Sequence, residues 1–279
     1  MISAAARRNV LEAAADAVAV FRASAVSMVV VLVLGLSSSP TMWLLVNVLL
    51  VSPFMFLAVA AHEAAHALTG LAVGMKPYRV SVGTGRTIFE TSIRNCRIDV
   101  HALPLSGVTY LATRAPRWVG LRFWVAIAGG PVFSVLLVQA LGLVQGDRRL
   151  AALSDSFAPS TVAWIAAWFA LAGSVIPLSF KSTLGQSRTD AWLLLTLPFW
   201  SAPRLAELRI AFHLLEAFDH HHARRFVEAI ACCDGAIAQA PDSYAARLTR
   251  ASLLVAQGEF ALGRAEARTL LSRTPAWPD

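Results

Sequence analysis

Two histidines and a glutamate lie close together near the end of an apolar stretch, in the run His62-Glu63-Ala64-Ala65-His66. In a helix, residues i and i+4 share a face, so the His62 and His66 imidazoles can point at one spot. This spacing suits two ligands of one metal ion, with Glu63 near enough to act as a general base. The motif therefore predicts a zinc site, with one ion per chain, that also carries out acid–base chemistry.

The surroundings of this motif help to decide between a metal site and a simpler alternative. Two histidines and a glutamate at a helix end can also satisfy one another without a metal. However, residues 23–61 contain no Asp, Glu, Lys or Arg, so the motif lies at the end of a stretch apolar enough for a membrane. Ionisable side chains at membrane depth cost about 2.5–3.5 kcal/mol each, and a zinc ion would compensate for that cost. We therefore favour the metal site.

A catalytic zinc site needs a third protein ligand and one open position. Asp190 is the best candidate, because it begins the apolar segment 191–195, which can return it to the same membrane depth. The other candidates are Asp99, His101 and the cluster His220-His221-His222. We interpret the histidine cluster as a solvated helix start.

The composition places the chain in a lipid bilayer. It is 57% hydrophobic and 15% charged, which is too apolar for a soluble protein. Residues 23–61, 123–146 and 156–180 carry no charge, and each stretch exceeds the roughly 20 residues that a spanning helix needs. The net charge of +7 could suggest nucleic acid, but the excess of Arg and Lys falls in residues 76–122, as in a cytoplasmic loop. We therefore expect no nucleic-acid partner.

The apolar stretches predict about four spans and the short apolar segment 191–195. The expected spans are residues 23–36 (beginning as early as 18), 41–73, 120–145 and 158–177. The turn signal Ser37–Pro40 separates the first two, and Pro53 predicts a kink in the second. By contrast, residues 77–111 alternate polar and β-branched residues. They predict short strands at 78–82, 87–91 and 97–101, with Gly83-Thr84-Gly85 as the turn between the first two.

The polar tail contains a possible repeat. Phe226 and Phe260 are 34 residues apart, as are Pro241 and Pro275, and the tetratricopeptide unit has this period. Further pairs at this spacing are Ala229 with Gly263 and Ala236 with Leu270. The alternative is a generic helical hairpin tail. Either would be helical and suited to holding another protein.

These segments predict an α-helical polytopic membrane protein with a small β-rich, membrane-associated insertion and a helical-repeat tail. Its parts are an N-terminal cytoplasmic segment (1–22), a membrane core (23–203, with the insertion at about 77–111) and a soluble tetratricopeptide-like domain (204–279). The positive-inside rule places the Arg-rich residues 76–122 in the cytoplasm, and with them the active site and the tail. Short, Arg-rich loops fit a bacterial inner membrane.

Over about residues 41–200 the sequence resembles the site-2 protease family of intramembrane zinc metalloproteases. The resemblance rests on the histidine motif in a membrane helix, followed by five segments in that family's order. These are Val82-Gly83-Thr84-Gly85 (its glycine turn), Leu103-Pro104-Leu105-Ser106-Gly107 (its I-P-L-G-G), Ala128-Gly129-Gly130-Pro131-Val132-Phe133-Ser134 (its A-G-P-x-x-N), Ser174-Val175-Ile176-Pro177-Leu178 (its N-x-x-P-L) and Thr189-Asp190-Ala191 (its S-D-G or L-D-G). The sequence departs from the family at Ser174, which replaces an asparagine, and at Ala191, which replaces a glycine.

The resemblance implies hydrolysis of a peptide bond in a membrane-tethered protein. His62, His66 and Asp190 would then be the zinc ligands, and Glu63 would activate the zinc-bound water. Ser174 would contact the substrate or the oxyanion, with a shorter side chain and one donor instead of two. The strand-rich segment would hold an extended substrate by β-addition.

Functions of two other classes compete with this one. The first is a membrane scaffold whose proteolytic core is weak or inactive and whose tail recruits a partner. The second is a transporter or channel that uses the intramembrane His and Glu, but residues 18–75 and 120–200 show none of the symmetry typical of transporters. We expect a protease whose tail, 204–279, recruits a protein partner or gates access from the cytoplasm.

Overall fold

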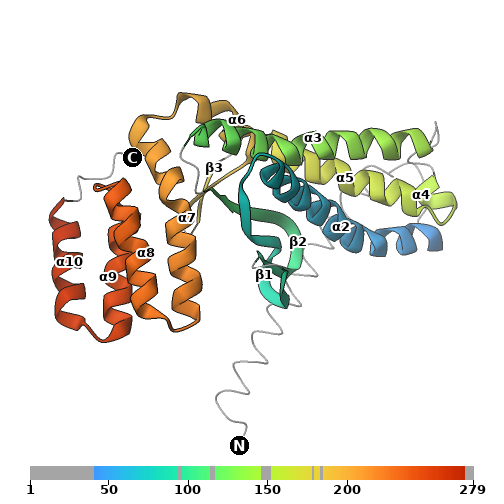
Figure 1. The fold of residues 1–279 in the computed structure, drawn as a ribbon. Coiled ribbons are helices and arrows are strands. Elements are labelled where there is room, and N and C mark those ends of the chain that lie inside the picture. Colours follow the sequence, from blue (N-terminus) through green and yellow to red (C-terminus); the bar gives the residue numbers. More distant parts are fainter. Residues whose placement is uncertain are drawn as a thin grey trace, which may run out of the picture. The chain divides into compact units, whose positions relative to one another are not determined.

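The computed structural model describes residues 41–93, 96–113, 117–145, 152–177, 179–182 and 185–273 (Figure 1). The predicted segment 1–22, the first span, the Ser37–Pro40 turn and Pro275 lie outside the described residues. The chain forms two compact units. Within the described residues, unit 1 holds 41–73, 77–111 and 124–196, and unit 2 holds 74–76, 112–123 and 197–273. The predicted domain boundaries stay predictions.

Helix α2 (Met42–Ala72) carries the histidine motif in its C-terminal half. Its first turn is capped by Thr41, whose side chain accepts a hydrogen bond from the Leu44 backbone N–H at 3.2 Å. Pro53 lies inside the helix without ending it. The helix predicted at 41–73 is therefore confirmed to within a residue at each end.

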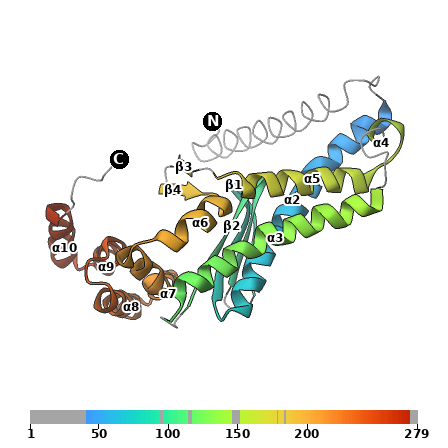
Figure 2. The ribbon, with the colours of Figure 1, turned by 90° about the horizontal axis from the view of Figure 1, so that it is seen from above.

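Two further apolar helices lie beside α2 in unit 1, as Figures 1 and 2 show. Helix α5 (Pro159–Val175) packs its Val162 and Ile165 against α2, and its Ala167 and Leu171 against Val138 of α3 (Val119–Gln145). Among the described residues, α2 and α3 are long and apolar enough to cross a membrane. Helix α5 has 17 residues, fewer than the roughly 20 needed, so four spans are not confirmed.

The β-rich insertion is a two-stranded sheet of β1 (Lys76–Ile93) and β2 (Cys96–Ala112). The predicted turn between Gly83 and Gly85 is wrong, because β1 continues through both glycines. Their φ angles are +89° and +88°, and a Cβ at Gly83 would lie 2.6 Å from the Leu103 carbonyl oxygen. These glycines therefore let one long strand bend close to its partner instead of ending it.

A short antiparallel pair, β3 (Ser179–Ser182) and β4 (Gly185–Arg188), leads from α5 to α6 (Asp190–Thr196). The predicted apolar segment that follows Asp190 is thus a short helix, which begins at Asp190 itself. A 3-10 turn, η1 (Leu197–Phe199), follows and begins the C-terminal part of unit 2.

The tail is helical, as predicted. Its helices are α7 (Ala202–His222), α8 (Phe226–Gln239), α9 (Tyr244–Gln257) and α10 (Phe260–Arg273), and each packs against the next. Helices α8 and α10 begin 34 residues apart, and Ala236 and Leu270, separated by the same period, are both buried. The tetratricopeptide assignment remains a prediction. The predicted helix start at residues 220–222 is wrong, because these histidines form the last turn of α7, shortly before Arg224 leaves the helix with a φ of +56°.

Candidate metal centre

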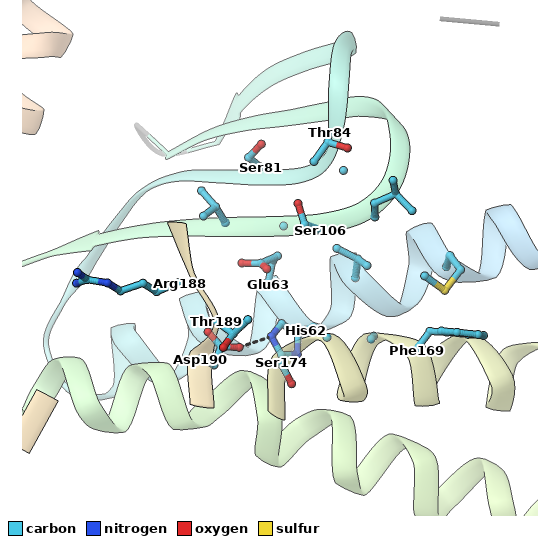
Figure 3. A pocket seen from close by; sticks show the side chains of 18 residues that line it. His62, Glu63, Ser81, Thr84, Ser106, Phe169, Ser174, Arg188, Thr189 and Asp190 are labelled. Carbon is cyan, nitrogen blue, oxygen red and sulfur yellow. Dashed lines mark hydrogen bonds and ion pairs between the residues drawn. The ribbon is translucent and has the colours of Figure 1, made fainter. Parts of the chain in front are cut away.

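Three side chains from two helices of unit 1, those of His62, His66 and Asp190, meet at one point. Figure 3 shows two of them, His62 and Asp190. The Oδ2 atom of Asp190, at the start of α6, lies 2.9 Å from His62 Nε2 and 3.3 Å from His66 Nε2. The two Nε2 atoms are 3.1 Å apart, and both histidines are buried. All three ligand atoms lie within 4.8 Å of one another, so the structure brings together the predicted ligand set.

The outer nitrogens of the two histidines have protein partners. His66 Nδ1 lies 2.9 Å from the Ala126 carbonyl oxygen, which can only accept, so Nδ1 must carry the proton. In a neutral His66 ring, Nε2 then presents a lone pair to the other ligand atoms. His62 Nδ1 lies 2.8 Å from the buried Ser134 hydroxyl. Such partners fix the orientation of metal-ligating histidines.

The donor set fits a divalent cation. Two imidazole nitrogens and a carboxylate oxygen are ligands that zinc accepts, and three protein ligands are typical of a catalytic site. Since His66 Nε2 cannot donate in the neutral ring, at least one pair of facing atoms consists of two acceptors. A cation among them would remove this conflict.

Gly130 of α3 leaves the space that these ligands need. A Cβ at this position would lie 2.7 Å from His62 Nε2 and 2.5 Å from His66 Cε1. Such distances are too short for any real side chain, so glycine is required for α3 to pass beside the site.

Glu63 projects toward β2 (Figure 3) and is buried beneath that strand. The Thr109 hydroxyl lies 2.7 Å from Glu63 Oε2 and 3.1 Å from the Glu63 backbone oxygen. A Cβ at Gly107 would lie 2.5 Å from Glu63 Cγ, so the β2 backbone covers the carboxylate closely. Strand β2 therefore determines where the predicted general base points.

A cavity of about 530 Å³ opens onto His62, Glu63 and Asp190. Its apolar lining comes largely from α2 and α5, and includes Met55, Val59 and Phe169. The polar residues that the sheet contributes are Ser81, Thr84 and Ser106, and Ser174, Arg188 and Thr189 add polar groups from α5 and the chain before α6 (Figure 3). An extended peptide segment could thus reach Glu63 between an apolar wall and a polar one.

The profile of peptidase family M50 matches residues 51–250 of the chain. The chain belongs to this family. M50 peptidases are intramembrane, zinc-dependent metalloproteases, and the match covers the histidine motif, β1 and β2, and Asp190. A comparison with curated proteins found no match.

Ser174, the predicted substrate or oxyanion contact, lines the cavity of this M50 peptidase. Its hydroxyl donates to the Leu171 carbonyl oxygen within α5 at 2.9 Å. In this rotamer it offers the cavity only its lone pairs, which can accept from a substrate N–H. To donate to an oxyanion it would first have to leave Leu171, and its role stays a prediction.

The other candidate ligands have different partners. Asp99 of β2 is buried and forms ion pairs with Arg79 and Arg97. Burial alone would raise the pKa of the Asp99 carboxyl, but the hydrogen bonds from Arg97 and Arg79 outweigh it and place that pKa below its ordinary value. His101 Nε2 lies 2.9 Å from the Ser81 hydroxyl. Neither residue joins the metal centre.

Sequence reasoning missed several residues that shape the site, namely Ala126, Gly130, Ser134, Gly107 and Thr109. The family-like segments 128–134 and 103–107 contain three of them, so the resemblance marked these segments without showing what their residues contact. The sequence around Thr109 does not predict its role, because nothing in the alternation of strand residues shows that Thr109 faces Glu63.

Proposed function

We propose that this M50 peptidase is an intramembrane zinc endopeptidase that hydrolyses a peptide bond of a membrane-tethered protein. The convergence of His62, His66 and Asp190 at the cavity that also holds Glu63 carries the proposal. These three residues would hold one zinc ion. When bound, zinc would polarise the scissile carbonyl and lower the pKa of a water toward about 7.

Glu63 would move the proton in this reaction. Its carboxylate would accept a proton from the attacking water and return it to the leaving amine, while Thr109 holds Oε2 in place. The covering strand and the cavity walls would limit access of bulk water to this proton transfer.

The substrate would be presented as an extended segment. Residues 105–108 of β2 line the cavity beside Glu63, and Leu105, Ser106 and Val108 are exposed. A transmembrane helix must unwind before its backbone can reach the metal centre, and pairing with a strand would satisfy the unwound backbone. The tail would recruit a protein partner, with the tail and the active site toward the cytoplasm of a bacterial inner membrane.

Metal content measured by mass spectrometry on detergent-purified protein tests the ligand set. We expect one zinc per chain in the wild type and loss of zinc in His66→Ala and Asp190→Ala. Asp155→Ala, which removes an exposed carboxylate from α4 (Ala152–Asp155), is the matched control and should keep its zinc. No zinc in the wild type after reconstitution would contradict the proposal.

Glu63→Gln tests the chemistry separately from metal binding. This variant should keep its zinc but lose proteolysis, because the amide cannot accept the proton. We would compare membrane-protein fragments in cells that express wild type or Glu63→Gln. New termini inside transmembrane segments should occur only with the wild type, and identical fragments in both would refute the assignment of Glu63.

A further inference from the structure

Unit 2 exposes a large aromatic side chain at the end of η1 and another directly before α3. Phe199 is 87% exposed, and Trp118, directly before α3, is 64% exposed. The stretch from residue 191 to residue 203 contains no charged residue. Aromatic side chains this exposed, one of them within an uncharged stretch, indicate a partner surface of matching chemistry.

This segment rests on the N-terminal end of α3. A Cβ at Gly120 would lie 3.3 Å from the Leu205 side chain and 3.7 Å from that of Leu197, so both sides of the η1–α7 junction pack on the first turn of α3. Helix α3 is long and apolar enough to cross a membrane, and Trp118 immediately precedes it. Trp118 therefore lies where this helix would leave the bilayer, and the η1–α7 junction packs on the helix turn that follows it.

Arginines accompany two of the aromatic rings. The Arg204 guanidinium carbon lies 4.0 Å from the centroid of the Trp200 ring, and that of Arg117 lies 6.0 Å from the centroid of the Trp118 ring. Tryptophan is enriched at the headgroup level of membranes, where its ring is half in the apolar layer. An arginine over such a ring can reach lipid phosphates while its stem stays on apolar surface.

We propose that Trp118, Phe199, Trp200 and Arg204 form an interface anchor, which holds the base of the C-terminal helical tail in the headgroup layer of the bilayer. Its partner is the lipid surface, because the patch continues the apolar helix α3 and pairs aromatic rings with positive charge. The anchor concerns the tail rather than the metal centre, so it does not depend on proteolytic activity.

Phe199→Cys, labelled with an environment-sensitive fluorophore, tests the anchor in the full chain. The free cysteines Cys96, Cys232 and Cys233 would be replaced, and the protein reconstituted in phosphatidylcholine nanodiscs with brominated acyl chains. We expect the label to lose on the order of half of its emission, as a probe at the apolar boundary would. Val227→Cys, 68% exposed on α8, is the matched control and should lose little. Equal quenching at both positions would overturn the proposal.

A second measurement keeps the native cysteines. A photo-crosslinking phenylalanine analogue at position 199 should gain the mass of one phospholipid after irradiation, whereas the same analogue at position 227 should not. Crosslinking of residue 199 to a second copy of the chain or to another protein, without lipid, would overturn the anchor and make this surface a protein interface.

Discussion

Helix α2 carries two buried polar sites, one in each half, and their hydrogen bonds differ in kind. At Asn47, the side-chain N–H groups donate to the carbonyl oxygens of Leu153 and Ser156 at 2.9 and 2.8 Å. Its carbonyl oxygen accepts from the Ala158 backbone N–H at 3.0 Å. Every donor there meets an acceptor, and the result ties α2 to the chain around α4.

At the metal centre, by contrast, acceptor atoms face one another. His66 Nε2 has no proton to donate in the neutral ring, yet it lies beside His62 Nε2 and Asp190 Oδ2. Both sites are buried and polar, so burial does not separate them. A site whose atoms are complementary supports the fold by itself, whereas a site whose neutral atoms are alike needs a metal ion or an added proton between them.

The largest effect is expected when the space beside the metal ligands is filled, because this tests directly whether the site needs a cation. Gly130→Ala would place its Cβ against both imidazoles, so we expect zinc affinity to fall on the order of 100-fold or more, and proteolysis with it. Gly173→Ala is the matched control, since it lines the same cavity and its Cβ would meet nothing within 4 Å. Metal titration of both variants checks the prediction. Normal zinc binding by Gly130→Ala would contradict the ligand geometry.

The next largest effect is expected at the complementary site. Asn47→Ala would leave the Ala158 N–H and two carbonyl oxygens without partners, and we expect it to destabilise the protein by about 2–4 kcal/mol. Its zinc content should stay at one per chain. Thermal unfolding in detergent gives the stability, with Leu45→Ala, an exposed position on the same helix, as the control. Zinc loss without a lower Tm would reverse the roles of the two sites.

A smaller effect should follow from removing one outer partner of the ligands. Ser134→Ala removes the hydroxyl beside His62 Nδ1, and we expect zinc affinity to fall about tenfold. Ser174→Ala also removes a buried hydroxyl, but one that donates to Leu171 and contacts no ligand. Its zinc affinity should equal that of the wild type. Equal affinities in all three proteins would exclude Ser134 as a positioning residue.

The smallest effect is expected at Asp99 in the sheet, outside the membrane helices, where the carboxylate is paired with arginine donors. Because its pKa in the folded state lies below the ordinary value, its ion pairs stabilise the sheet fully above that ordinary value. This contribution is lost as the pH falls through the folded-state pKa. The protection factors of amides in β1 and β2, which correct for the intrinsic pH dependence of hydrogen exchange, should therefore fall in acid, and Asp99→Asn should weaken this dependence. Glu90→Gln, at an exposed carboxylate, should change it less.

Local spacing predicted the parts of the site that lie within one element. The helical period alone places His62 and His66 on one face, and the apolar segment 191–195 brought Asp190 into consideration. Gly130 and Ser134 act across helices, and their contacts with α2 depend on how α3 packs, which no local pattern encodes. The family resemblance marked their segment without giving their partners.

The wrong predictions have a common physical cause. A glycine with positive φ suits both a turn and a bend within a paired strand, and the choice at Gly83 depends on where Leu103 passes. The histidines at 220–222 suit either end of a helix by polarity alone. In both cases the residue that decides the local structure lies outside the motif: Leu103 for the glycines, and Arg224 for the histidines.

Because Thr109 donates a hydrogen bond to Glu63, the position of the proposed base depends on two elements. Helix α2 supplies the carboxylate, but strand β2 sets its direction, and the same strand borders the cavity. A peptide that paired with β2 would therefore bind to the strand that carries Thr109, the residue that orients the Glu63 carboxylate. Under the proposed mechanism, substrate binding and proton transfer would therefore be coupled through β2. A displaced strand would leave the proposed metal ligands in place but would change the direction of the Glu63 carboxylate.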